Sequence, residues 1–146
     1  SMVGYQDESY AYFKKAATID LYNASKKVMS GGSFLGGIHT AACGAVWQMI
    51  VQGFAGLRVE DGLATHAGLA THTGLATHAV RFEPALPAHW KQVTFRLVIG
   101  GTRLNVQMDN DRVKLTAEET NKAAVEVRVW GKSKQVRPGE TASMVR

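Results

Sequence analysis

The chain has 146 residues, of which 45% are hydrophobic and 20% charged, an ordinary composition for a folded soluble protein. Its net charge of +5 is spread along the sequence rather than gathered in a basic stretch with interleaved aromatic side chains, which argues against a nucleic-acid-binding protein. Cys43 is the single cysteine and excludes an internal disulfide framework. The first residues show no export signal, so we expect a cytoplasmic protein.

The first predicted element is an amphipathic helix that begins near Asp7 and runs to about Ser25. Either Asp7 or Ser9 can cap its N-terminus, because both side chains accept hydrogen bonds from the free N–H groups of a first turn. The apolar side chains that recur at helical spacing are Tyr10, Phe13, Ala17 and Leu21. After this helix the glycines at 31, 32, 36 and 37 interrupt the chain.

A second helix is predicted over residues 38–54, and it differs from the first in being apolar on every side. Residues 38–57 contain no Asp, Glu, Lys or Arg. The recurring apolar positions are Ile38, Ala41, Ala42, Ala45, Val46, Met49, Ile50 and Phe54, and Cys43, Trp47 and Val51 fill the opposite face. A helix of this kind is buried all round, which makes Cys43 a small core residue. Gly53 and Gly56 are predicted to end the helix.

The rest of the chain offers too little apolar surface to cover this helix. The helix approaches the length of a membrane span, but His39, Gln48, Gln52 and several small residues argue against insertion, so we predict no membrane partner. Symmetric pairing of two copies is a common way to cover such a face. We therefore expect a homo-oligomer formed through residues 38–54.

After Leu57 the apolar pattern alternates with a period of two, which predicts strands. The inward-facing positions of the predicted strands are Val93, Phe95, Leu97 and Ile99, then Leu104, Val106 and Met108, then Val113 and Leu115, and finally Val125, Val127 and Val129. Gly100-Gly101 is a hairpin signal, and Lys132–Val136 is expected to return across Gly131. Pro84 and Pro87 place the preceding segment in an irregular connection. The fold class predicted is α+β, with a helical pair at 1–57 and an antiparallel β-sandwich at 58–146.

A repeat reading LATHAG, LATHTG, LATHAV lies between residues 63 and 80. One interpretation makes His66, His72 and His78 metal ligands, since imidazole suits Zn, Ni and Cu. Six residues of extended chain span about 20 Å, however, so one strand cannot bring these side chains to one ion. A second interpretation is a hexapeptide β-helix, although three hexapeptides make a single coil with no neighbour to cover it. We favour the third, a duplicated or engineered loop.

Several motifs in this order resemble the C-terminal end of glycoside hydrolase family 65, the inverting phosphorylases of maltose, trehalose, kojibiose and nigerose. The residues that carry the resemblance are GGIHTAACGAVWQMIVQGFAGL, RVEDG and RFEPALPAHWKQVTFRLVIGGTRLNVQM, preceded by AYFKKAATIDLYNAS. The match covers roughly residues 10 to 109 and is interrupted at 63–79 by the repeat. The resemblance implies a fragment, with 1–57 as the end of an (α/α)6 barrel and 58–146 as a small jelly-roll-like module.

The reaction that the resemblance implies is phosphorolysis of an α-linked glucosyl disaccharide to β-glucose 1-phosphate, with inorganic phosphate as co-substrate and no other cofactor. The family's general-acid Glu lies in a part of the barrel that has no counterpart here, so the chain is expected to be inactive alone. By resemblance, Ser33, Gly37 and His39 are the phosphate contacts. The residues themselves permit this, because free N–H groups at a helix start favour an anion. A glycine-rich stretch before a helix is also commonly an ordinary turn.

Two alternatives stay open. Trp90 and Trp130 could form a sugar-stacking platform, which would make the second half a carbohydrate-binding module. The family position of Trp90 points instead to packing at the module's edge. The chain could also be a non-enzymatic, self-associating or engineered scaffold.

Glu60, Asp61 and Glu83 could suggest paired catalytic carboxylates, but we interpret them as solvated charges at strand ends.

Overall fold

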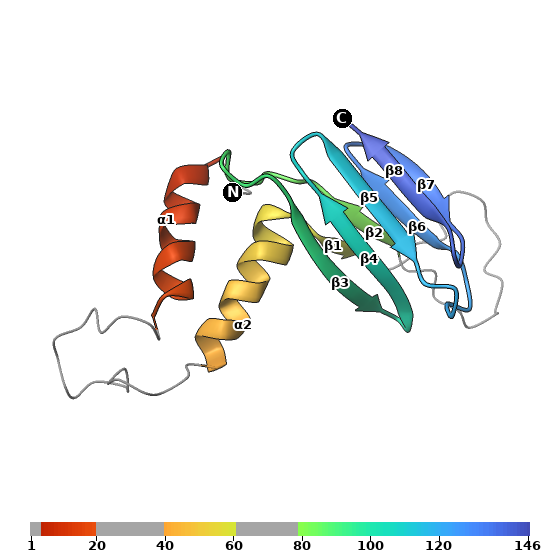
Figure 1. The fold of residues 1–146 in the computed structure, drawn as a ribbon, viewed down its shortest axis with the longest axis horizontal. Coiled ribbons are helices and arrows are strands. Elements are labelled where there is room, and N and C mark those ends of the chain that lie inside the picture. The colour runs from red at the N-terminus through yellow and green to blue at the C-terminus, as the bar shows by residue number, and fades with distance from the viewer. Residues whose placement is uncertain (1–3, 20–39, 61–78) are drawn as a thin grey trace, which may run out of the picture.

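The computed structural model describes residues 4–19, 40–60 and 79–146, and it consists of two helices beside a β-sandwich (Figure 1). Helix α1 spans Gln6–Ala17, and α2 spans Thr40–Gln48 and continues as a π-helix, η1, over Met49–Phe54. The strands are β1 (Arg58–Glu60), β2 (Ala79–Phe82), β3 (Val93–Ile99), β4 (Thr102–Met108), β5 (Arg112–Ala117), β6 (Val125–Val129), β7 (Lys132–Val136) and β8 (Thr141–Val145).

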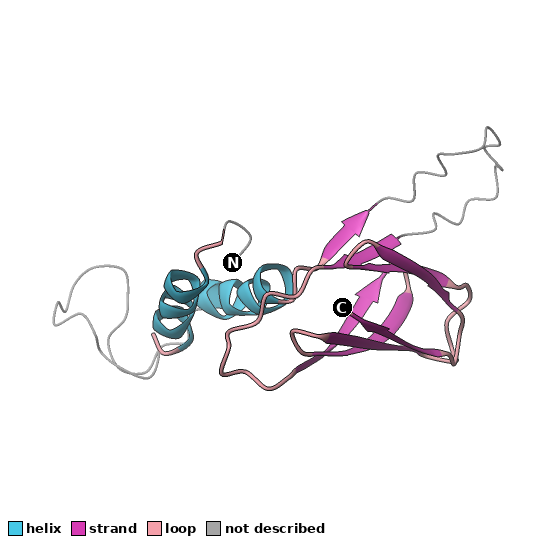
Figure 2. Ribbon diagram, turned by 90° about the horizontal axis from the view of Figure 1, so that it is seen from above, coloured by secondary structure: helices cyan, strands magenta, loops and turns pink. Residues whose placement is uncertain are grey.

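The strands form two four-stranded sheets that pack face to face (Figure 2). Sheet A has the order β1-β2-β6-β7, and sheet B has the order β3-β4-β5-β8. The α+β class is confirmed, whereas the prediction of a wholly antiparallel β-domain is wrong at one pair. β2 runs parallel to β6, with Val80 opposite Val127. A parallel pair is possible here because three strands of sheet B, β3, β4 and β5, lie between β2 and β6 in the sequence and supply the long crossover.

The hairpins predicted from glycine are confirmed. β3 and β4 pair in register across Gly100 and Gly101, which have φ angles of 55° and 83°. β6 and β7 pair across Trp130 and Gly131, which also have positive φ. Two consecutive positive φ angles are what a two-residue hairpin turn requires. The residues around Pro84 and Pro87 form the expected irregular connection between β2 and β3.

The core lies between the two sheets, where alternate residues of each strand point inward. Val106, Val113, Leu115, Val127 and Val129 are fully buried there. The end of the helical segment takes part as well, because Val51, Phe54 and Leu57 belong to the same buried cluster. Burial of a side chain of this size stabilises the fold by about 1.5–3 kcal/mol.

Helix α1 differs from its prediction at both ends. Its N-cap is Tyr5, which makes no side-chain cap, and Asp7 and Ser9 lie within the helix. The Ser9 hydroxyl donates instead to the carbonyl of Tyr5, at 2.6 Å. The helix ends at Ala17, short of the predicted Ser25, where Thr18 donates from its hydroxyl to the carbonyl of Lys14. A β-branched residue with such a local bond is a poor continuation of a helix.

Helix α2 contains no buried residue, so the prediction of burial on every side is wrong for this chain. The side chain of Trp47 is 49% exposed, and Cys43 is exposed rather than part of the core. The reason is geometrical. Among the described elements, α2 makes its main contacts with α1 and with η1, and the sheets lie beyond its C-terminal end (Figure 1).

Candidate functional site

The predicted phosphate-binding residues lie outside the described residues; they are Ser33, Gly37 and His39. The same is true of Asp61 and of the repeat histidines His66, His72 and His78. After the predicted phosphate segment, the described residues resume at Thr40, the first residue of α2. The role of these residues therefore stays a prediction.

A groove of about 620 Å³ lies between the helical segment and the first strand of sheet A. Its lining comes from α2, η1 and β1 and the turn between them. The residues are Ala45, Gln48, Met49, Gln52, Gly53, Leu57, Arg58 and Val59. It is a mainly apolar groove with two amides and one guanidinium, a composition that fits an interaction surface better than a catalytic centre.

The π-helix creates one wall of this groove. The N–H of Ala55 donates to the carbonyl of Ile50 at 2.8 Å, a hydrogen bond over five residues instead of the usual four. Val51 and Phe54 are buried in the core, while Gln52 is exposed and lines the groove. π-Helical turns occur often at functional sites. The apolar pattern of residues 38–54 contained no signal for this change of pitch.

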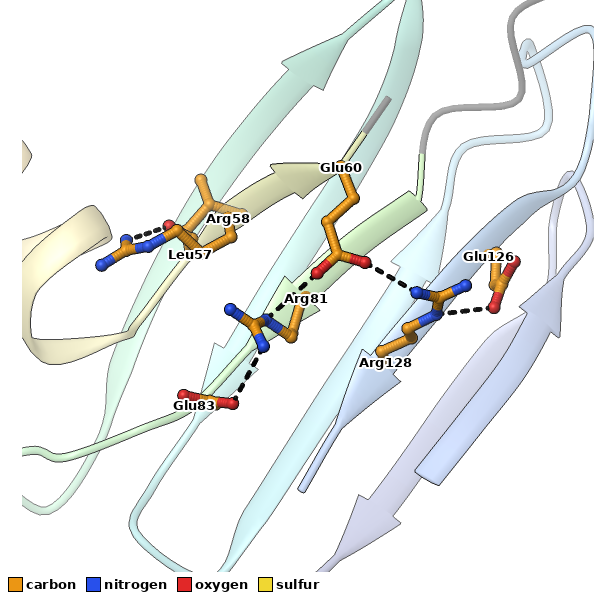
Figure 3. A network of polar contacts seen from close by, with 7 residues as sticks. All are labelled: Leu57, Arg58, Glu60, Arg81, Glu83, Glu126 and Arg128. Atoms are coloured by element: carbon orange, nitrogen blue, oxygen red, sulfur yellow. Dashed lines mark hydrogen bonds and ion pairs between the residues drawn. The ribbon is translucent and has the colours of Figure 1, made fainter. Parts of the chain in front are cut away.

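Arg58 sits at the end of the π-helix and was not anticipated from the sequence. Its guanidinium Nη1 donates to the carbonyls of Gln52 and Leu57. Figure 3 shows the side chain directed toward the helical segment rather than toward its strand neighbours. Carbonyls at a helix end lack partners within the helix, so Arg58 satisfies one of them and fixes the floor of the groove.

A network of ion pairs covers the outer face of sheet A (Figure 3). Glu60 on β1 contacts Arg81 of β2 at 3.3 Å and Arg128 of β6 at 2.7 Å. Arg81 also pairs with Glu83, and Arg128 with Glu126 at 2.8 Å. Glu60 and Glu83 thus share one arginine, an arrangement that ties β1 and β2 to the sheet.

The same network shifts two pKa values. The hydrogen bond from Arg128, with a second from Ser133, holds the pKa of Glu126 below its ordinary value of 4.5. The hydrogen bond to Glu126 raises the pKa of Arg128 in return. Both shifts favour the charged forms, as expected of an ion pair between two neighbouring side chains on the same face of one strand, β6.

An aromatic cluster joins α1 to the sandwich. Phe13 lies edge-on to Phe54 and Trp90, with ring centroids 5.7 Å and 5.4 Å away, and Tyr10 contacts His89 and Trp90. Three rings therefore contact Trp90, which agrees with a packing role at the module's edge. Trp130 is partly buried against the core as well.

Within residues 4–19, 40–60 and 79–146 there is no group of three His, Cys, Asp or Glu side chains placed to hold a metal ion. No helix in those ranges is both long enough and apolar enough to cross a membrane.

Comparisons with known proteins place this architecture. Residues 77–136 match the family description "Glycosyl hydrolase family 65, C-terminal domain". The chain is 34% identical over 125 residues to the 1,2-alpha-glucosylglycerol phosphorylase of Bacillus selenitireducens, covering 86% of this chain and 14% of the relative. It is 31% identical over 137 residues to the kojibiose phosphorylase of Halothermothrix orenii, covering 92% of this chain and 15% of the relative.

A solved structure agrees in fold. A protein from the human microbiome, described as a candidate kojibiose phosphorylase, superposes with a TM-score of 0.70 at 21% identity, over 100% of this chain and 16% of its own. This likeness shows a shared fold, a two-sheet β-module with a helical segment. The chain is related to the disaccharide phosphorylases of glycosyl hydrolase family 65 and carries that family's C-terminal domain. It spans about one seventh of the length of these curated relatives.

Proposed function

We propose that this chain serves as the phosphate-side end of an inverting disaccharide phosphorylase. The reaction is phosphorolysis of an α-linked glucosyl disaccharide to β-glucose 1-phosphate and a second sugar. Inorganic phosphate attacks the anomeric carbon from the face opposite the leaving oxygen, which a general acid protonates. The names of the relatives support a glucosyl substrate: two are phosphorylases of the disaccharides kojibiose and trehalose, and one is a phosphorylase of 1,2-alpha-glucosylglycerol, in which glycerol takes the place of the second sugar.

The observation that carries the proposal is the exposed apolar surface of α2. Trp47 is half exposed and no residue of α2 is buried, while the sandwich next to it has a complete core. An apolar helix that leaves a tryptophan half exposed and buries none of its residues is typical of an interaction site. In a phosphorylase, the α1–α2 pair would pack against the remaining helices of an (α/α)6 barrel, and the jelly-roll-like sandwich would hold the pair in place.

Ser33, Gly37 and His39 are assigned to the phosphate in this proposal. They immediately precede α2, whose N-terminal N–H groups favour an anion. The general-acid Glu is assigned to a part of the barrel without a counterpart in this chain. The isolated chain is therefore expected to bind phosphate weakly and to catalyse nothing.

Two measurements test these statements. The purified chain, incubated with inorganic phosphate and kojibiose, trehalose, nigerose or glucosylglycerol, should release no glucose 1-phosphate; sustained release would refute the inactivity. Phosphate titration followed by NMR should detect binding that His39→Ala removes. His89→Ala, a substitution of an exposed histidine in the β2–β3 connection, is the matched control and should bind phosphate normally. Equal loss in both variants would contradict the assignment of His39.

The exposure of α2 also favours a second candidate, self-association of two copies through residues 38–54. Light scattering distinguishes the two. A mass near the 15.8 kDa of one chain would contradict self-association, whereas a discrete dimer that Trp47→Glu dissociates would support it.

A further inference from the structure

The outer face of sheet B is basic and contains no acidic side chain. Strand alternation turns one set of side chains from β3, β4, β5 and β8 outward. They are Thr94, Arg96, Val98, Arg103, Asn105, Gln107, Arg112, Lys114, Thr116, Thr141, Ser143 and Val145. Four are cationic, six carry hydroxyl or amide groups, and none is Asp or Glu. We call this set the sheet B face.

The two outer faces of the sandwich differ in how their charges are paired. On sheet A, Arg81 and Arg128 bind carboxylates of Glu60, Glu83 and Glu126. On the sheet B face, Arg103 has a distant partner in Glu118, at 3.9 Å. The side chains of Arg96, Arg112 and Lys114 have no acidic partner among the described residues. Uncompensated cations on one face produce a local positive potential that attracts anions.

The register of the strands arranges these cations in a diagonal band. Arg96 lies opposite Asn105, and Lys114 lies opposite Gln107 in the next outward row. Arg103 lies one row beyond Arg96, and Arg112 one row beyond Lys114. The spacing between strands and along them puts neighbouring cations about 7–12 Å apart. Hydroxyl and amide groups fill the positions between them, including the bonded pair Thr116 and Thr141 at 2.8 Å.

Neither helix covers this face, because both lie at one end of the sandwich (Figures 1 and 2). The face contains no aromatic side chain, so it offers no platform for stacking bases of single-stranded nucleic acid. A face four strands wide does not fit a DNA groove, which admits a helix or a two-stranded ribbon. Its two valines are too few for an apolar protein partner. A partner rich in both carboxylates and hydroxyls matches what remains.

We propose that the sheet B face binds an acidic polysaccharide, with uronate carboxylates on Arg96, Lys114 and their cationic neighbours and sugar hydroxyls on the amide and hydroxyl side chains between them. This role is independent of phosphorolysis. It would hold the protein on an anionic glycan without involving Ser33, Gly37 or His39.

Binding of the full chain to polygalacturonate, measured by calorimetry at 50 and 300 mM NaCl, tests the proposal. We expect the affinity for polygalacturonate to fall strongly as the salt concentration rises, as charge pairing requires. The double substitution Arg96→Gln with Lys114→Gln should weaken the binding at least about tenfold. The control, Lys14→Gln with Lys15→Gln, removes the same number of positive charges from α1 and should leave the binding unchanged. Circular dichroism confirms that each variant is folded.

Three results would overturn the proposal. Neutral dextran binding as tightly as polygalacturonate would exclude carboxylate recognition. Equal weakening by the α1 control would show attraction to net charge rather than to this face. Oligodeoxythymidylate binding more tightly at the same salt concentration would assign the face to nucleic acid.

Discussion

The helical segment and the β-sandwich are built from similarly apolar sequences, yet they end in opposite environments. In the sandwich, alternate side chains such as Val106 and Leu115 are fully buried between two sheets. In α2, a more continuously apolar stretch buries nothing. The difference lies in what each element faces, since a sheet paired with a second sheet covers its own apolar side, whereas a helix at the end of the molecule does not. The sandwich is therefore the part that stabilises the chain, and the helices are the part that offers surface.

The largest effect should come from comparing one core residue with one residue of α2. Leu115→Ala removes a fully buried side chain and should lower the free energy of unfolding by about 2–5 kcal/mol, whereas Trp47→Ala should change it by less than about 0.5 kcal/mol. Urea denaturation followed by circular dichroism measures both. If Trp47→Ala were as costly as Leu115→Ala, α2 would be covered in solution, and the contrast between the two regions would fail.

A smaller effect is expected at the joint between the regions. Gly56 has a φ of +66°, and a Cβ atom added there would lie 2.3 Å from the carbonyl oxygen of Glu83. Gly56→Ala should therefore lower the free energy of unfolding by about 2–3 kcal/mol, from the left-handed backbone and the clash together. Gly101→Ala is the matched control, because Gly101 has a φ of +83° with open space around it.

The control should cost about 1 kcal/mol, the conformational part alone. Thermal unfolding of both variants measures the difference. Equal destabilisation would mean that the segment carrying Glu83 moves aside, so that the contact between the two regions at this point is loose.

The smallest effect concerns the charged face of the sandwich. Because hydrogen bonds hold the pKa of Glu126 below 4.5, its carboxylate stabilises the folded state above that pH, and the contribution disappears as the pH falls through the lowered value. Glu126→Gln should lower the free energy of unfolding by about 0.5 kcal/mol at pH 7, and this loss should shrink as the pH falls below 4.5.

Urea denaturation over this pH range, at low salt, measures the effect. Glu119→Gln, a substitution of an exposed carboxylate in the β5–β6 connection, is the control, because it also removes one negative charge from the surface but leaves the ion pairs of Glu126 in place. A loss well above 1 kcal/mol would indicate that ion pairs, and not only the core, stabilise the sandwich.

The strands that could be predicted are those whose own residues specify them. β3 and β4 alternate cleanly, and Gly100-Gly101 supplies the two positive φ angles of their turn. β1 and β2 escaped prediction because they are short, and β8 escaped it because its apolar pattern is weak. β1 has only three residues, and β8 alternates the inward Ala142 and Met144 with hydroxyl side chains. The parallel pairing of β2 with β6 joins segments far apart in the sequence, so no local pattern encodes it.

The candidate site likewise contains residues that the sequence identified and residues whose roles depend on the folded structure. The glycines and His39 were identified from sequence and resemblance, and they remain predictions. Arg58 and Glu60 were not given their structural roles from the sequence, because an arginine or a glutamate at a strand end is ordinary until its partners are known. Arg58 finds the carbonyl of Gln52 in η1, and Glu60 finds two arginines on different strands, only once the chain is folded.

By itself the sequence determined the α+β class, the hairpins and the family relationship, because periodicity, turn glycines and motif order are local properties of the chain. Only the tertiary structure decided which apolar residues are covered. Residues 38–54 carry enough apolar surface to require a partner, but burial depends on what lies opposite, and in this chain the core accepts Val51 and Phe54 and leaves α2 exposed. The tertiary structure also decided the difference between the two outer faces of the sandwich. Strand register pairs the charges on sheet A with one another and leaves the sheet B face basic.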